Sequence, residues 1–408
     1  MIPSAKTTTN RGLLWAVSTA LGVFVLSLTL DRSFYDRTVA DAFFSLTVAA
    51  FTLVFISVSA RPKTDVWQLA LLASVMAALQ MLVLKVHFNT LPALATLGIG
   101  GFLIVAIRRI WSQGELSRLL NYALVPPLLL VLIGAWGSTL LGITGRLHPR
   151  TLDLSLYDFD QSLGLQPSCR LGQVILRSHW LKSSAVFLYY GLPLPIMFVY
   201  GRQLVRERNF ALTAFLAFLV TGPIGVLFYN LVPACGPIYL LGARFPFDPP
   251  SVRQLIELTL QPPVVSGARN AFPSLHMCWA LLVFWYSVGL SFRVRFLLFL
   301  FLIATMLAIF GLGEHYFVDV VAAFPLAVMI EAGCALQLPI LDRRRVLPSL
   351  AGLTLLLGWV GLLRSGLVPA WASPISSWAL IALTIAVSLF LHGRLRNAVL
   401  GASVTGTR

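Results

Sequence analysis

Apolar stretches long enough to cross a lipid bilayer run through almost the whole sequence. A membrane-spanning helix needs about 20 mostly apolar residues, and twelve stretches approach that length. They are 12–30, 40–59, 67–86, 91–107, 122–144, 183–200, 210–232, 271–291, 294–313, 316–336, 348–363 and 374–392. Charged residues make up 11% of the chain, whereas an average soluble domain has about 25%. The sequence therefore predicts an all-α, polytopic membrane helix bundle with about 12 transmembrane helices, and it excludes an ordinary soluble enzyme and a disordered chain.

The basic residues predict how this bundle is oriented. The chain carries 30 Lys and Arg against 15 Asp and Glu, a net charge of +15. Most of the basic residues fall at the N-terminus, in the even-numbered loops and in the C-terminal tail, and cytoplasmic segments carry such an excess. We therefore predict both termini in the cytoplasm and the odd-numbered loops facing outward, across the inner membrane if the source is bacterial. No basic stretch alternates with aromatic residues, so the charge predicts topology and not nucleic-acid binding.

Two long outward loops, 145–182 and 233–270, interrupt the pattern of spans. The first mixes Leu, Phe and Tyr with Asp, which predicts short helices lying on the membrane. The second holds seven prolines, which stop regular helix and fix extended or turn geometry, so we expect it to shape a site. Each loop contains one cysteine, Cys169 and Cys235, and a disulfide between them is an open alternative to two free thiols.

The order of the spans brings two histidines to the same face of the membrane. His276 lies near the outward start of span 271–291, and the chain returns outward through 294–313, so that His315 begins the next span on that face. Asp319 follows His315 by four residues and therefore lies on the same side of a helix. An ionisable group inside a span is costly and is usually functional.

These three side chains suit phosphoryl transfer. An imidazole held by a carboxylate can act as a nucleophile or a general base, because the carboxylate fixes its tautomer. A second histidine can protonate the leaving oxygen, while arginines and the backbone N–H groups at span starts would stabilise a phosphate. A single histidine at a membrane interface is more often a capping or amphipathic residue, but two on one face with an i+4 Asp favour catalysis.

Two motifs resemble the second and third signatures of the type 2 phosphatidic acid phosphatase superfamily. They are Phe272-Pro273-Ser274-Leu275-His276 and His315-Tyr316-Phe317-Val318-Asp319-Val320. With the upstream run from Tyr229 to Tyr239, they look closest to the inositol phosphorylceramide synthase branch, with sphingomyelin synthase a more distant relative. The resemblance covers roughly 122–336 and implies a catalytic six-helix core there. Accessory transmembrane helices would occupy 1–121, and further transmembrane helices and a cytoplasmic tail would occupy 337–408.

The resemblance also implies a mechanism and a set of site residues. His315 would attack the phosphorus, oriented by Asp319, and His276 would protonate the leaving group, so that a phosphohistidine forms without a metal or cofactor. The phosphatase branch of the superfamily has an arginine six residues before the nucleophile, where this chain has Ile309, so the phosphate clamp must differ. The candidates for binding phosphate are Arg269 first, then Arg244 and Arg253, together with Ser274, Tyr229 and Asn230. Packing is an equal alternative for Tyr229 and Asn230, and Ser274 can also cap a helix.

The leading functional prediction is an integral-membrane lipid phosphotransferase acting on the outer face. It would move a phosphate, or a phospho-headgroup such as phosphoinositol, from a phospholipid or other lipid-phosphate donor to an alcohol or lipid acceptor. A lipid phosphate or polyprenyl diphosphate phosphatase, with water as the acceptor, is the first alternative. A polyprenyl-phosphate-dependent glycosyltransferase using Asp31 and Asp36 is the second, and it leaves the histidines unexplained. A transporter or scaffold is the third, and the intact histidines and Asp319 argue against it. The expected partners are membrane lipids, with no nucleic acid, and the sequence predicts no oligomeric state.

Overall fold

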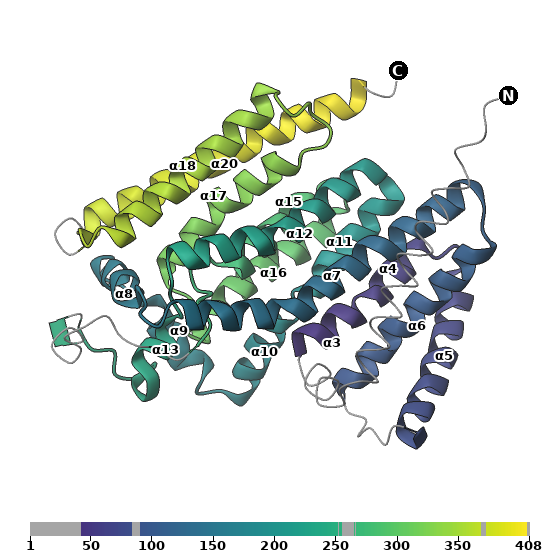
Figure 1. Cartoon of the computed structure of the whole chain (residues 1–408), viewed down its shortest axis with the longest axis horizontal. Coiled ribbons are helices and arrows are strands. Elements are labelled where there is room, and N and C mark those ends of the chain that lie inside the picture. The colour runs from purple at the N-terminus through teal and green to yellow at the C-terminus, as the bar shows by residue number, and fades with distance from the viewer. Residues whose placement is uncertain are drawn as a thin grey trace. The chain divides into compact units, whose positions relative to one another are not determined.

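The computed structural model describes residues 42–83, 90–251, 253–254, 265, 267–368 and 373–405. These residues form helices joined by loops, and none of them lies in a β-strand (Figure 1). The predicted all-α class is therefore confirmed for the described chain. The chain divides into two compact units, Met1–Ala135 and Trp136–Arg408. The predicted boundaries after residues 121 and 336 remain predictions.

Unit 1 is a small group of helices held by close backbone approach and by an ion pair between a buried aspartate and a partly exposed arginine. Its described helices are α3 (Ala42–Ala49), α4 (Phe51–Val58), α5 (Pro62–Val83), α6 (Thr90–Trp111) and the first part of α7 (Gly114–Leu147). Gly98 lets α6 approach α3, because a Cβ there would lie 1.9 Å from the carbonyl oxygen of Val48. Arg108, in the last turn of α6, donates a hydrogen bond of 3.0 Å to Asp65 in the first turn of α5.

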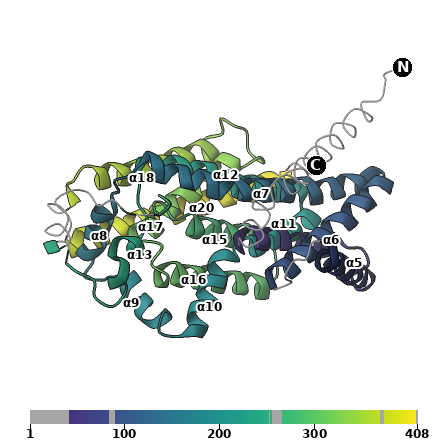
Figure 2. The ribbon, with the colours of Figure 1, turned by 60° about the horizontal axis from the view of Figure 1, so that its bottom comes forward.

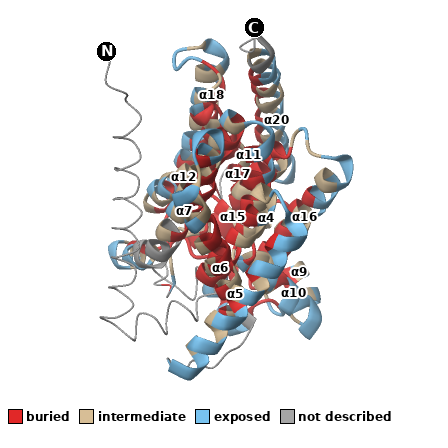
Figure 3. Ribbon diagram, turned by 90° about the vertical axis from the view of Figure 1, so that its right-hand side faces the viewer, coloured by how far each residue is buried: buried red, intermediate tan, exposed pale blue. Residues whose placement is uncertain are grey.

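Unit 2 is built around α17. Its helices are the rest of α7, α8 (Asp153–Ser162), α9 (Pro167–Ile175), α10 (His179–Tyr190), α11 (Pro193–Arg206), α12 (Arg208–Leu231), α13 (Pro237–Leu241), the 3-10 helix η1 (Gly242–Arg244), α15 (Leu275–Tyr286), α16 (Phe292–Gly311), α17 (Phe317–Cys334), α18 (Arg343–Arg364) and α20 (Pro374–Thr405). Helix α17 packs against α12, α15, α18 and α20, and most of its residues are buried (Figure 3). The short helices α8, α9 and α13 gather at one end of this unit, and α8 contacts α17 there (Figures 1 and 2).

Eight of the described helices are long and apolar enough to cross a membrane. The pair α10 and α11, bent by 48°, makes a ninth if it counts as one span. This supports a multi-pass membrane protein but does not confirm about 12 spans. Residues 40–41 and 84–86 lie outside the described residues, and the rest of each predicted span from 40–59 onward overlaps described helices, although 40–59 is interrupted at Ala50 and α15 has only 12 residues. The first predicted span, 12–30, lies outside the described residues.

The two long loops fold against the start of α17. The first contains α8 and α9, so the predicted short helices are confirmed, while their position on a membrane remains a prediction. In the second, Gly236 has a φ of +116°, and a Cβ there would lie 2.4 Å from the carbonyl oxygen of Glu314. The backbone N–H of Ile238 donates to the carbonyl of Gly313 at 3.0 Å. The proline-rich loop therefore lies directly against the turn that precedes His315.

Candidate active site

The two histidines of the sequence motifs come together at the N-terminal ends of two helices. His276 lies in the first turn of α15, and His315 lies two residues before α17 begins. Their ring centroids are 6.1 Å apart, and the ring planes are inclined by 59°. This separation lets a phosphorus atom approach one ring to about 3–3.5 Å while a leaving oxygen stays within hydrogen-bond reach of the other.

His315 is 1% exposed and is held through its Nδ1 atom. Nδ1 lies 2.9 Å from the carbonyl oxygen of Ala271 and 3.5 Å from Oδ2 of Asp319. A carbonyl oxygen accepts hydrogen bonds and cannot donate them, so Nδ1 must carry the proton. The remaining ring nitrogen, Nε2, then keeps its lone pair, which is the state that a nucleophile requires.

Asp319 is fully buried and belongs to the first turn of α17. Its Oδ2 atom also accepts a 2.7 Å hydrogen bond from the backbone N–H of Tyr316, whereas Oδ1 has no partner among the described residues. The backbone N–H of Ser274, just before α15, donates to the carbonyl of Asp319 at 3.0 Å. Asp319 therefore links the two histidine-bearing helix starts and contacts His315. The predicted contact is present, but the prediction that both residues lie on one helix is wrong, because Tyr316 is extended and α17 begins only at Phe317.

His276 is positioned by aromatic rings. Its imidazole stacks on the ring of Tyr189 from α10, with centroids 3.9 Å apart and planes inclined by 22°, and Trp279 lies at 6.4 Å. The structure gives the imidazole nitrogens of His276 no hydrogen bond to any described residue. Both nitrogens thus remain available to a substrate, as a proton donor or acceptor requires.

Three residues near the histidines were given no catalytic or binding role by the sequence. The ring of Tyr189 stacks on the ring of His276. Glu314, which precedes His315 in the chain, is hydrogen-bonded to Tyr239. Burial raises the pKa of Glu314, against the opposing effects of His315 and the Tyr239 hydroxyl. Burial also raises the pKa of Tyr239 to about 12, and the Glu314 charge adds to this effect. Glu314 could have been found from the sequence, because it is next to His315. Tyr189 lies on a separate helix, and no sequence pattern connects it with His276.

Arg269, the first candidate for the phosphate clamp, has a different set of contacts. It is 2% exposed, and its guanidinium donates to one thiol and to four backbone carbonyls. The acceptors are Cys235 Sγ and the carbonyls of His148, Pro149, Val265 and Gly267. These contacts fasten the proline-rich loop to the end of α7, and phosphate binding by Arg269 remains a prediction. Arg244, in η1, and Arg253 are exposed.

The polar candidates have structural partners. Ser274 caps α15, because its hydroxyl accepts a 3.3 Å hydrogen bond from the N–H of Met277, so the predicted cap is confirmed. Asn230 Oδ1 lies 2.9 Å from His148 Nε2, and Asn230 Nδ2 donates to the carbonyl of Val226. Tyr229 is 3% exposed in the last turn of α12. Substrate contact by these three residues stays a prediction.

The two helix starts differ in what they offer to an anion. At α17, the N–H groups of Tyr316, Phe317 and Val318 donate to the carboxylates of Asp319 and Asp160. At α15, the N–H groups of Leu275 and His276 have no hydrogen bond to any described residue. Free N–H groups at a helix start attract anions, so phosphate is better accommodated at α15 than at α17.

Cys169 and Cys235 are not paired. Both are buried free thiols in the structure, so the alternative of a disulfide between them is wrong. Cys235 instead accepts a 2.9 Å hydrogen bond from Arg269. Burial raises the pKa of Cys169 to about 11 and that of Cys235 to about 12, so both thiols stay protonated near neutral pH.

Comparison with known proteins assigns the region around the histidines to a family. Residues 154–332 match the model of the PAP2 superfamily, the type 2 phosphatidic acid phosphatases. No curated protein and no solved structure matches the chain. The matched segment contains His276, His315 and Asp319, and it is shorter at its N-terminal end than the predicted core, 122–336. The match over residues 154–332 is consistent with a membrane enzyme acting on lipid phosphates.

Proposed function

We propose that this chain is an integral-membrane phosphotransferase that moves a phosphate or a phospho-headgroup from a lipid donor to an alcohol through His315. The observation that carries the proposal is the environment of His315. Its Nδ1 faces two acceptors, the Ala271 carbonyl and Asp319, and the second histidine lies 6.1 Å away. The arrangement supplies a neutral nucleophile with a fixed tautomer and a separate proton donor.

The reaction has two steps that share a proton. In the first, the Nε2 lone pair of His315 forms a bond to phosphorus while the bond from phosphorus to the leaving oxygen breaks. His276, which the bound anionic phosphate favours in its protonated form, gives its proton to that oxygen. In the second step, the acceptor hydroxyl attacks the phosphohistidine, the N–P bond breaks, and His276 takes the hydroxyl proton. Asp319 stabilises the positive charge that develops on the His315 ring.

The choice of acceptor separates a transferase from a phosphatase. The similarity of the Tyr229–Tyr239 run and the two histidine motifs to inositol phosphorylceramide synthase supports an alcohol or lipid acceptor, and phosphoinositol is the headgroup that this similarity suggests. Purified protein incubated with a phospholipid labelled in its headgroup, with and without a lipid alcohol, tests the proposal. We expect the label to move to the added alcohol. Release of water-soluble phosphate alone, unchanged by the alcohol, would instead establish the phosphatase.

The same assay tests the glycosyltransferase alternative. Asp31 and Asp36 lie outside the described residues, but each can be replaced by Asn. We expect these replacements to leave headgroup transfer within a few-fold of wild type and His315→Ala to remove it. The reverse pattern would reject the histidine mechanism.

We further propose that the site faces away from the cytoplasm. The distribution of basic residues supports this orientation, and the starts of α15 and α17 with the end of α16 place His276 and His315 on one side. Single cysteines introduced at Arg244 and Arg343, in a background where the native cysteines are Ser or Ala, test it. An impermeant maleimide added to intact cells should label the first and not the second.

A further inference from the structure

Helix α8 carries two buried carboxylates on one face. Asp153 and Asp160 are 0% and 1% exposed. They lie seven residues apart, about two helical turns, and therefore share a side of the helix. A buried carboxylate is costly unless hydrogen bonds compensate the loss of water. Each of these two receives its hydrogen bonds from the segments that position the histidines.

Asp160 binds the first turn of α17. Its Oδ2 accepts a 2.8 Å hydrogen bond from the N–H of Phe317, and its Oδ1 accepts a 3.4 Å bond from the N–H of Val318. The first N–H groups of a helix have no partner within the helix and normally need a capping group. Here a carboxylate from another helix caps α17 two residues after His315, and negative charge is favoured at that end of the helix dipole.

Asp153 ties the proline-rich loop to the same place. It accepts hydrogen bonds from the N–H groups of Cys235 and Gly236, at 3.1 and 2.9 Å, and a 2.8 Å bond from the hydroxyl of Tyr316. Tyr316 is the residue between His315 and α17, and its own N–H donates to Asp319. One carboxylate thus holds the side chain of Tyr316, the residue whose backbone N–H binds Asp319 beside His315.

We infer that Asp153 and Asp160 are positioning residues, which hold the first turn of α17 so that Asp319 stays aligned with Nδ1 of His315; this inference rests on the proposed histidine mechanism. Without Asp160, the N–H groups of Phe317 and Val318 lose their acceptor and compete for the carboxylate of Asp319. Asp319 would then turn from His315 toward its own helix. The nucleophile would lose the partner that orients it, although no group touching the substrate had changed.

The helix offers a matched control. Asp158 lies between the two positioning residues on α8, and its side chain makes no hydrogen bond to any described residue. Asp160→Asn and Asp158→Asn therefore remove the same charge from the same helix. Only the first replaces a carboxylate that accepts two backbone N–H groups.

The experiment compares headgroup turnover by wild type, Asp160→Asn and Asp158→Asn, each purified and checked for a single folded peak. Loss of a carboxylate that orients a catalytic histidine costs about 10–100-fold in activity. We expect Asp160→Asn to lose this much in kcat with KM within about threefold, and Asp158→Asn to keep both near wild type.

The pH profile separates positioning from simple loss of folded protein. The titratable groups around the pair of His315 and Asp319 are His276, Glu314, Tyr316, Tyr229, Asp153 and Asp160. Because Asp160 belongs to this set of groups, Asp160→Asn should change the shape of the pH profile of kcat as well as its amplitude. A variant that was only partly unfolded would lose amplitude and keep the wild-type profile.

Tyr316→Phe keeps the inference falsifiable if Asp160→Asn fails to fold. It removes one hydroxyl that donates to Asp153 and leaves every carboxylate in place. We expect kcat to fall about threefold to tenfold with KM unchanged. Wild-type kcat and pH profile in Asp160→Asn, or in Tyr316→Phe when the first variant does not fold, would overturn the inference. His315→Ala separates a failure of this inference from a failure of the proposed mechanism. If His315→Ala retained activity, the histidine mechanism itself would be rejected.

Discussion

Helix α17 has a histidine–carboxylate pair at each end, and the two pairs differ in what surrounds them. At its start, Nδ1 of His315 lies 3.5 Å from Asp319. At its far end, Nδ1 of His392 from α20 lies 2.7 Å from Glu331. The second pair has the closer contact. Its imidazole stacks on Trp285 at 4.0 Å, much as His276 stacks on Tyr189.

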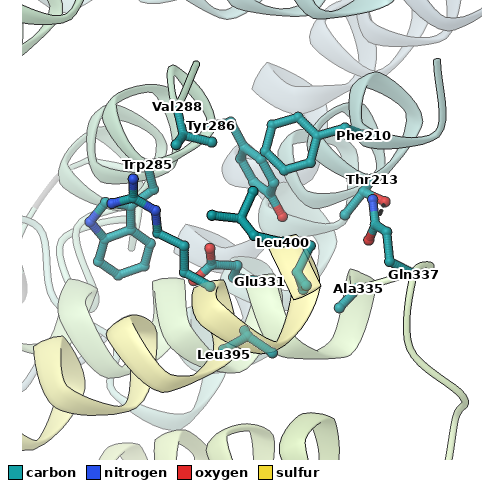
Figure 4. Close-up of a pocket in the computed structure, with 12 residues that line it drawn as sticks. Phe210, Thr213, Trp285, Tyr286, Val288, Glu331, Ala335, Gln337, Leu395 and Leu400 are labelled. Atoms are coloured by element: carbon teal, nitrogen blue, oxygen red, sulfur yellow. Dashed lines mark hydrogen bonds between the residues drawn. The ribbon is translucent and has the colours of Figure 1, made fainter. Parts of the chain in front are cut away.

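The surroundings show why a close histidine–carboxylate contact does not by itself make a catalytic site. His315 has a second histidine as its ring neighbour, and it lies near the start of α15, where the N–H groups of Leu275 and His276 have no hydrogen bond to any described residue and can bind a phosphate. Glu331 lies near the C-terminal end, where the dipole opposes an anion. It lines a pocket with Tyr286 and Gln337 (Figure 4). The same residue types therefore form the proposed site of phosphoryl transfer at one end and a helix-to-helix contact at the other.

The largest expected difference between the two ends is the effect of removing each histidine. His315→Ala deletes the proposed nucleophile, and loss of a nucleophile costs about 10⁴-fold or more. His392→Ala removes an imidazole of α20 that contacts the far end of α17, and it should leave turnover within about threefold. Transfer of a labelled headgroup by both purified variants measures the contrast. Equal losses in the two would mean that the contact with a carboxylate, rather than its place on α17, decides activity.

Replacing His276 should have the next largest effect, and the effect should depend on the leaving group. Loss of a general acid costs about 10²–10⁴-fold. An activated ester, whose leaving group departs without a proton, should lose less than about tenfold. Rates of His276→Ala with an unactivated phospholipid and with a p-nitrophenyl phosphodiester test the assignment. An equal loss with both substrates would remove His276 from the role of proton donor.

The carboxylates give a smaller but sharper contrast. Asp319→Asn keeps the size of the side chain but removes the charge that stabilises the His315 ring, and we expect about a 100-fold loss in kcat. Glu331→Gln makes the matching change at the other end and should keep kcat within about threefold. Steady-state kinetics of the two variants side by side decide the matter. A larger loss of kcat in Glu331→Gln than in Asp319→Asn would contradict the assignment of catalysis to the start of α17.

The first pair was predictable from the sequence and the second was not, for a physical reason. His315 and Asp319 are four residues apart across the start of one helix, and the order of spans brings His276 close to them. Glu331 and His392 meet only through the packing of α17 against α20. Local periodicity reveals contacts within a helix, whereas contacts between helices depend on how their surfaces fit.

The same limit explains what the sequence missed around the site. Arg269 was interpreted as an outward loop arginine available to phosphate, but it is buried and bound to backbone carbonyls. Carbonyl groups occur at every residue, so no sequence pattern announces such a partner. Asp153 and Asp160 likewise accept from backbone N–H groups. Windows of 20 apolar residues located the helices well, yet they could not show the bend between α10 and α11 or the break at Ala50.

Breaking the contact between Glu331 and His392 should have the smallest effect on activity but a measurable effect on stability. Glu331 and His392 are largely buried, with 11% and 12% of their side chains exposed, so the contact is shielded from water. Breaking it leaves a buried polar group without its partner, which costs about 1–3 kcal/mol. His392→Ala and Glu331→Gln should therefore unfold at lower temperature in detergent than wild type, while Asp158→Asn should not. Full thermal stability in both variants would mean that the C-terminal helix is held by its apolar face alone, and the two ends of α17 would then differ in stability as well as in chemistry.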